Sequence, residues 1–253
     1  MIHILLEELN DRVIRGEPLP ENEIQSACNS FLDSAVSYNG NGFEKNPLRS
    51  VYWHTPSENG KYPRNFMGVL PKTAIFADNF LELEILRFLY LYSCDPRVDE
   101  MCGVTLERLS RACIGRFCEK GECVGASISA LRFLSAVKPD SEDTNDLASK
   151  LIAYYNSHPQ GMAGYSRNLP RFYVFLALSD IQSDNAKAFL AEKTDFMKTM
   201  LTRGCLTGPA VQDTYNVRLL YILRNALSKV DGYAYVRENP VYIRGDGRCV
   251  CNI

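Results

Sequence analysis

Two kinds of helical segment alternate along this chain, and the alternation restricts the folds that it can adopt. Apolar residues spaced three and four apart predict helices over about 79–93, 99–115, 124–137, 143–157, 170–180, 184–203 and 215–229. The first, third, fifth and seventh of these are apolar almost all round, and the others are amphipathic. A helix that is apolar on every side is buried, whereas an amphipathic helix lies at the surface. We therefore expect an all-α protein with alternating inner and outer helices.

The alternation has a period of about 45 residues, which indicates a repeat of helical hairpins. The tetrapeptide LRFL occurs at residues 86–89 and again at 131–134, and a related LR pair follows at 223–224, about two periods later. Residues 1–38 contain two more predicted helices and can supply a further pair. Chance similarity between leucine-rich helices is the alternative explanation of the repeat.

Helical hairpins stack either as an open solenoid or as a ring, and the ring fits better here. In a solenoid both helices of a pair are usually amphipathic, but here one member is far more apolar and its connections are long and polar. With Asn79, Val124, Pro170 and Asn216 starting successive inner helices, residues 1–229 resemble the α/α toroid of terpenoid cyclases, protein prenyltransferases and several glycosidases and polysaccharide lyases. The Asp-x-Asp-Asp motif of class II cyclases is missing, and the zinc ligands of prenyltransferases find no match. The resemblance implies a toroid-like ring of hairpins, closed or incomplete.

The chain is expected to form a single domain with four parts. Residues 1–38 form the first hairpin, 39–75 a lid-like loop rich in Gly, Pro and Asn, 76–229 the hairpin repeats, and 230–253 an irregular tail that forms a small hairpin or wraps the ring.

Composition limits the partners of the protein. The formal charge of −2 has no basic excess, so we expect no nucleic-acid partner. The apolar runs are too short and too interrupted to span a membrane. The N-terminus has no basic region of the kind that begins a signal peptide, so we expect a cytoplasmic protein.

Nine cysteines are many for a chain of 253 residues. In the cytoplasm they are expected to be reduced, and most of them to pack as small apolar side chains. Cys113, Cys118 and Cys123 are spaced by five residues, which allows zinc binding but matches no strong zinc motif, so no metal or cofactor is predicted. A nucleophilic Cys123 at a helix start is a further alternative.

In a ring, the segments that enter the inner helices share one rim, where candidate site residues meet. The predicted acid and base residues are Asp78, Glu82, Glu122, Asp213 and His54. The predicted substrate-binding residues are Trp53, Asn79, Tyr165, Arg167, Arg171, Tyr173, Tyr215 and Asn216. The alternatives are that Asp78 and Asn79 cap a helix, and that Glu82 and Glu84 form ion pairs.

The function expected from these residues is acid–base chemistry on a hydrophobic or cyclic small molecule in an aromatic-lined cavity. The toroid resemblance implies a lyase or isomerase similar to the terpenoid cyclases. One alternative is a helical-repeat scaffold that binds a peptide or partner protein. Another is a carbohydrate-active hydrolase or lyase on the same scaffold. The sequence leaves the oligomeric state open.

Overall fold

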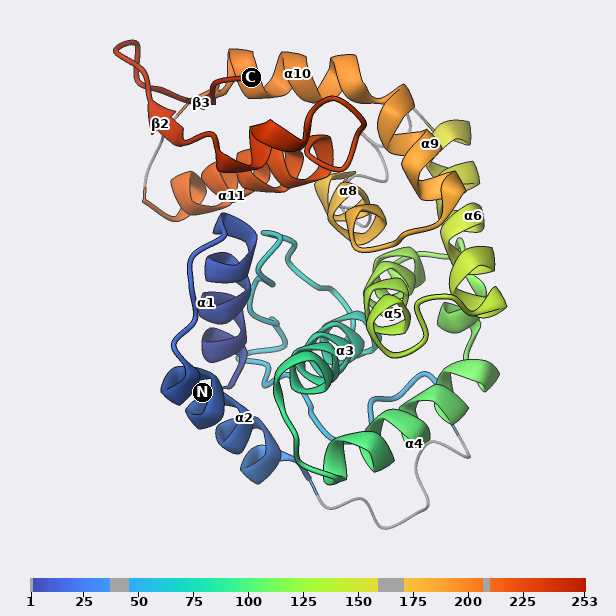
Figure 1. Ribbon diagram of the computed structural model, residues 1–253. Coiled ribbons are helices and arrows are strands. Elements are labelled where there is room, and N and C mark those ends of the chain that lie inside the picture. Colours follow the sequence, from blue (N-terminus) through green and yellow to red (C-terminus); the bar gives the residue numbers. More distant parts are fainter. Residues whose placement is uncertain (1, 37–45, 159–170, 207–209) are drawn as a thin grey trace.

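The computed structural model describes residues 2–36, 46–158, 171–206 and 210–253, and it shows an all-α protein, as predicted (Figure 1). Its α-helices are α1 (Ile2–Arg15), α2 (Glu21–Ser34), α3 (Ala74–Tyr92), α4 (Arg97–Arg111), α5 (Cys123–Val137), α6 (Glu142–Ser157), α8 (Arg171–Ser179), α9 (Asp184–Glu192), α10 (Thr194–Arg203) and α11 (Ala210–Leu227). Two short 3-10 helices are η1 (Cys113–Arg116) and η2 (Ala234–Glu238).

Inner and outer helices alternate in the structure. Helix α3 packs against α5, α5 against α8, α8 against α11, α11 against α1, and α1 against α3. Helices α2, α4, α6, α9 and α10 lie outside them in Figure 1, each in contact with an inner neighbour. The toroid scaffold itself stays a prediction.

Burial separates the two kinds of helix. Nearly every residue of α3 from Phe76 to Leu89 and of α5 from Val124 to Leu134 is buried, whereas α4 and α6 bury one face each. All-round apolar character therefore identified α3 and α5 as inner helices, whereas the inner helix α1 is amphipathic and buries one face. None of the helices described is long and apolar enough to cross a bilayer.

Several helix boundaries differ from the expected ones. Helix α3 begins at Ala74 because the Thr73 hydroxyl accepts a hydrogen bond from the Phe76 N–H and caps the helix. Asn79 therefore lies inside the helix rather than at its start. Likewise α11 begins at Ala210, and the single helix expected over 184–203 is divided at Lys193 into α9 and α10.

Two stretches of the predicted lid, around Trp53 and Phe66, are packed into the core, whereas residues 56–61 between them are exposed. The Trp53 and Phe66 side chains are both only 1% exposed. The ring of Phe66 lies 5.1 Å from that of Phe80 and 5.8 Å from that of Tyr173, between centroids. The cavity beside Phe66 and Phe80 measures about 30 Å³, which is room for about two water molecules. At this place aromatic side chains fill the interior that the sequence suggested as a substrate cavity.

The C-terminal tail forms a small sheet with a short strand that follows α10. Strands β1 (Cys205–Leu206), β2 (Val241–Ile243) and β3 (Arg248–Cys251) pair antiparallel in the order β1-β3-β2. Gly204, at φ +66°, precedes β1, and a Cβ there would lie 2.0 Å from the Cys249 carbonyl oxygen. Glycine at this position lets the two strands approach each other. The expected hairpin of the tail is present as β2 and β3.

Candidate metal centre and the predicted site residues

Glu82 lies in the core, where it holds a loop in place. Its carboxylate accepts hydrogen bonds from the Val51 and Tyr52 N–H groups and from Arg108 Nη2, the last at 3.0 Å. The Glu82 and Arg108 side chains are both 0% exposed. Burial lowers the pKa of Arg108, and Glu82 partly offsets that effect. These contacts hold the 51–52 segment and Arg108 in place and give Glu82 a structural role, while its acid–base role stays a prediction.

Asn79 belongs to the same buried network. Its side-chain oxygen accepts from Arg108 Nη1 at 2.7 Å, and its amide donates to the Leu48 carbonyl at 2.8 Å. The structure thus brings Asn79 and Glu82 together through Arg108. Both residues bind backbone groups of the segment that the sequence assigned to a lid.

Asp78 and His54 are the predicted acid–base residues that lie in direct contact. His54 Nδ1 is 3.3 Å from Asp78 Oδ2 and 3.1 Å from the Ser50 hydroxyl. Asp78 also accepts from the Thr55 N–H at 2.7 Å, so it ties the 50–55 segment to α3. The imidazole is 54% exposed. An acid–base role for this pair stays a prediction.

Glu122 connects the starts of two inner helices. It precedes α5, but its carboxylate accepts from the Lys72 N–H at 2.8 Å and the Thr73 hydroxyl at 2.6 Å. Trp53 Nε1 donates to the Phe31 carbonyl at 3.2 Å and is buried against α2. These contacts give both residues structural roles and do not join them to His54.

Tyr173 takes part in a second buried network. Its hydroxyl donates to Glu84 and contacts Ser129 Oγ at 3.3 Å. Burial, followed by the charge of Glu84, raises the pKa of Tyr173 well above its usual range. Arg132 Nε lies 3.1 Å from Glu84 Oε1, so the ion pair between inner helices that the sequence offered as an alternative is present for Glu84.

Three predicted residues lie on α11, and the side chains of two of them are described. Tyr215 is partly buried beneath the Arg218 guanidinium, whose carbon is 5.3 Å from the ring centroid, and Asn216 is also partly buried. Tyr165 and Arg167 lie outside the described residues. Arg171 and Asp213 are in α8 and α11, but their side chains are outside the described part of the structure. The described candidates therefore divide among several networks instead of forming one rim site.

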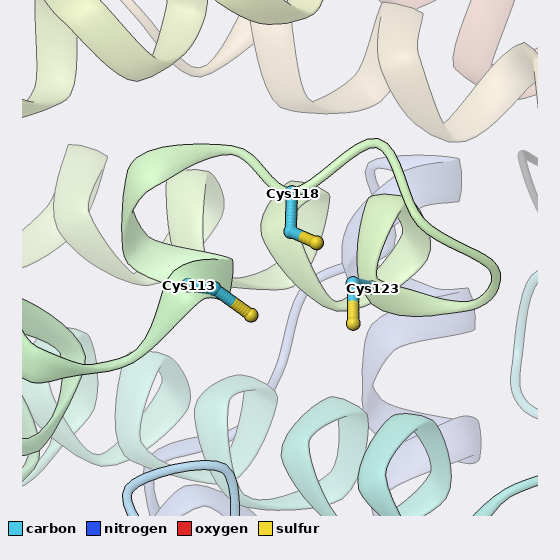
Figure 2. Close-up of side chains that lie close together, drawn as sticks. All are labelled: Cys113, Cys118 and Cys123. Atoms are coloured by element: carbon cyan, nitrogen blue, oxygen red, sulfur yellow. The ribbon is translucent and has the colours of Figure 1, made fainter.

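Among the described residues, three cysteines form a cluster of potential metal ligands. The Sγ atoms of Cys113, Cys118 and Cys123 all lie within 4.8 Å of one another. Figure 2 shows them on η1, on the connecting loop and at the first turn of α5, with their sulfur atoms directed into a shared space. All three are free thiols, and Cys113 is exposed while the other two are partly buried.

The local backbone explains how these thiols converge. Phe117 has a left-handed conformation at φ 61°, which reverses the chain just before Cys118. Gly115 lies so close to α4 that a Cβ would be 2.4 Å from the Leu109 carbonyl oxygen. The loop is thereby folded back onto α4 before the chain continues to Cys123, the first residue of α5.

The surroundings favour the protonated thiols of Cys113 and Cys123 when no cation is bound. Desolvation and the two neighbouring cysteines raise the pKa of Cys123 to about 12. Desolvation, followed by Cys118, raises the pKa of Cys113. These directions disfavour the nucleophilic Cys123 considered from the sequence, because the thiolate is the nucleophile.

The fold and the thiol cluster define an all-α helical-hairpin protein with a candidate metal centre. Comparison with protein-family models, with curated proteins and with solved structures found no match to this chain.

Proposed function

We propose that this protein reversibly binds a thiophilic metal ion, with Zn²⁺ as the reference ion, through Cys113, Cys118 and Cys123. The observation that carries the proposal is the approach of three sulfur atoms to within 4.8 Å of one another. With Zn–S bonds of about 2.3 Å, two sulfurs on a tetrahedral ion are about 3.8 Å apart. A sulfur therefore needs to move by about 1 Å or less to complete the site, which a small side-chain rotation provides.

Charge supports a cation at this position. Desolvation, followed by the charges of the other two cysteines, raises the pKa of Cys123 to about 12 in the absence of a cation. A bound metal reverses this effect, since it stabilises the thiolates and releases their protons. Soft sulfur ligands select Zn²⁺ or Cu⁺ over Mg²⁺ or Ca²⁺.

The number of ligands indicates an exchangeable site. Structural zinc sites usually have four protein ligands, whereas three leave one coordination position for water or another ligand. Among the described residues the cluster contains three ligands, and Cys113 is exposed to solvent. An ion can therefore enter and leave without unfolding of the inner helices.

The test is zinc binding by the reduced protein in competition with a chromophoric chelator. One Zn²⁺ per chain is expected, and Co²⁺ should give thiolate-to-metal charge-transfer absorption. Cys113→Ser, Cys118→Ser and Cys123→Ser should each weaken binding by more than the 10- to 100-fold typical of outer-shell changes.

Cys94→Ser is the matched control, because Cys94 is an exposed free thiol outside the cluster. It should bind zinc like the unmodified protein. Zinc binding that is absent from the reduced protein, or that is equal in Cys118→Ser and Cys94→Ser, contradicts the proposal.

A further inference from the structure

A second candidate site, independent of the cysteines, lies between the inner helices and η2. It is a cavity of about 260 Å³ lined by residues of α1, α3, α5, α8, α11 and η2 and of the turns that follow α8 and α11. Five charged residues line it: Arg87, Arg132, Asp180, Lys229 and Arg237. Four of the five are cations, and after Asp180 and the Glu84 carboxylate behind Arg132 are counted, two positive charges remain in excess.

Arg132 is the buried centre of this cavity. Its side chain is 2% exposed, and its guanidinium carbon lies 5.5 Å from the Tyr173 ring centroid and 5.9 Å from that of Phe66. Burial lowers the pKa of Arg132, but the charges of Glu84 and Asp180 raise it by more than burial lowers it. The guanidinium therefore stays charged. The two rings and these carboxylates hold it in one orientation.

The arginine donors in this cavity are incompletely used. Arg132 Nη1 is buried without a hydrogen-bond partner within the described part of the chain, and so is Arg87 Nε. Arg132 Nε is 3.6 Å from Asp180 Oδ2, and Arg87 Nη2 donates to that same oxygen at 3.2 Å. A buried donor of a charged group without a partner is costly, so a ligand that accepts from it is favoured.

Lys229 and Arg237 add charge at the exposed side of the cavity. Neither forms an ion pair with another described residue. Cations near helix C-termini also offset the helix dipole, which is a purely structural role. That role leaves unexplained why Arg132 is buried with a free donor in a cavity.

We propose that this cavity binds a compact dianionic oxyanion, either a phosphate group or a dicarboxylate, with Arg132 as the buried anchor. Guanidinium groups match the oxygens of phosphate and carboxylate, often through paired hydrogen bonds. The volume is slightly below the usual range for small-molecule pockets, which suits a small ligand or the anionic end of a larger one. Asp180 is already paired with both arginines, which reduces its repulsion of the ligand.

The experiment is calorimetric titration of the full chain with sodium phosphate and, separately, sodium malonate, at constant ionic strength set by sodium chloride. One anion per chain is expected. Lys229→Ala/Arg237→Ala should weaken binding at least about tenfold, because charge-assisted contacts are lost from exposed side chains. Arg132→Lys keeps a cation beside Glu84 but loses the planar guanidinium with its paired N–H donors. It should therefore also weaken binding.

Lys150→Ala/Arg244→Ala is the charge-matched control, because it removes two cations from exposed ion pairs outside the cavity. It should leave the affinity unchanged. Binding of phosphate alone identifies a phosphate-bearing ligand, and binding of malonate alone a dicarboxylate. The proposal is overturned if neither anion binds, or if the Lys229/Arg237 double variant binds as tightly as the control.

Discussion

The buried pair of Glu82 and Arg108 provides the sharpest test of whether Glu82 is structural or catalytic. We expect Glu82→Gln to destabilise the protein strongly. The carboxylate accepts hydrogen bonds from the N–H groups of Val51 and Tyr52 and from Arg108 Nη2. A carboxamide has one acceptor oxygen and one donor nitrogen. In either orientation its NH2 group therefore faces another donor, which is either the two backbone amides or the arginine.

The size of the effect follows from burial. Both side chains are 0% exposed, and removing one partner of a buried ion pair costs about 3–5 kcal/mol. Because a native domain is stable by about 5–15 kcal/mol, this is a large share of the total. Urea unfolding followed by circular dichroism should show a midpoint lower by about 1–2.5 M, given a typical urea dependence of about 2–3 kcal/mol per molar.

Glu107→Gln is the matched control in this comparison. Glu107 pairs with Arg111 on the surface of α4, and its side chain is 55% exposed. Such pairs contribute about 0.5 kcal/mol or less. If the free energies of unfolding of Glu82→Gln and Glu107→Gln differ by less than about 1 kcal/mol, Glu82 does not anchor the loop. The acid–base role predicted from the sequence then regains support.

Three further predictions concern the core, the sheet and the thiols. Phe66→Ala should lower the free energy of unfolding by about 3–5 kcal/mol in the same urea assay, since it empties space between the inner helices; a cost below 1 kcal/mol would contradict the packing described. Gly204→Ala should cost more than Gly232→Ala, because both have positive φ but only the former places a Cβ against the Cys249 carbonyl; equal unfolding midpoints would show that the strands adjust freely. Zinc affinity should rise about tenfold per pH unit for each thiol that is still protonated. The reason is that the pKa of Cys123 is raised to about 12 and that zinc binding releases the proton. Chelator competition at pH 6.5 and 7.5 measures this rise, and an unchanged affinity would contradict thiolate ligation.

Local patterns predicted the helices well. The segment expected over 124–137 is Cys123–Val137, and that expected over 143–157 is Glu142–Ser157. Periodic burial imposes a 3.6-residue pattern on each helix, so the pattern can be read without knowing its neighbours. The start of α3 was missed because Asp78 and Asn79 are typical capping residues, although here they bind the 47–55 segment and Arg108.

The thiol cluster was visible only as a spacing. Five-residue intervals match no strong zinc motif, and they place cysteines together only if the chain reverses sharply between them. The left-handed Phe117 and the close approach of Gly115 to α4 provide that reversal. Neither feature follows from the residue types alone.

The sequence by itself determined the all-α class and which segments after residue 75 are inner and outer helices, because the apolar pattern of each helix depends on its own residues. It left the C-terminal tail open between a hairpin and a segment that wraps the ring. Tertiary structure alone decided what the polar residues do. Arg108 meets Glu82 across 26 positions, and Tyr173 meets Glu84 across 89. Such partners depend on which helix faces pack together and on how the helices are shifted along their axes relative to each other. The periodicity of a single helix carries no information about either.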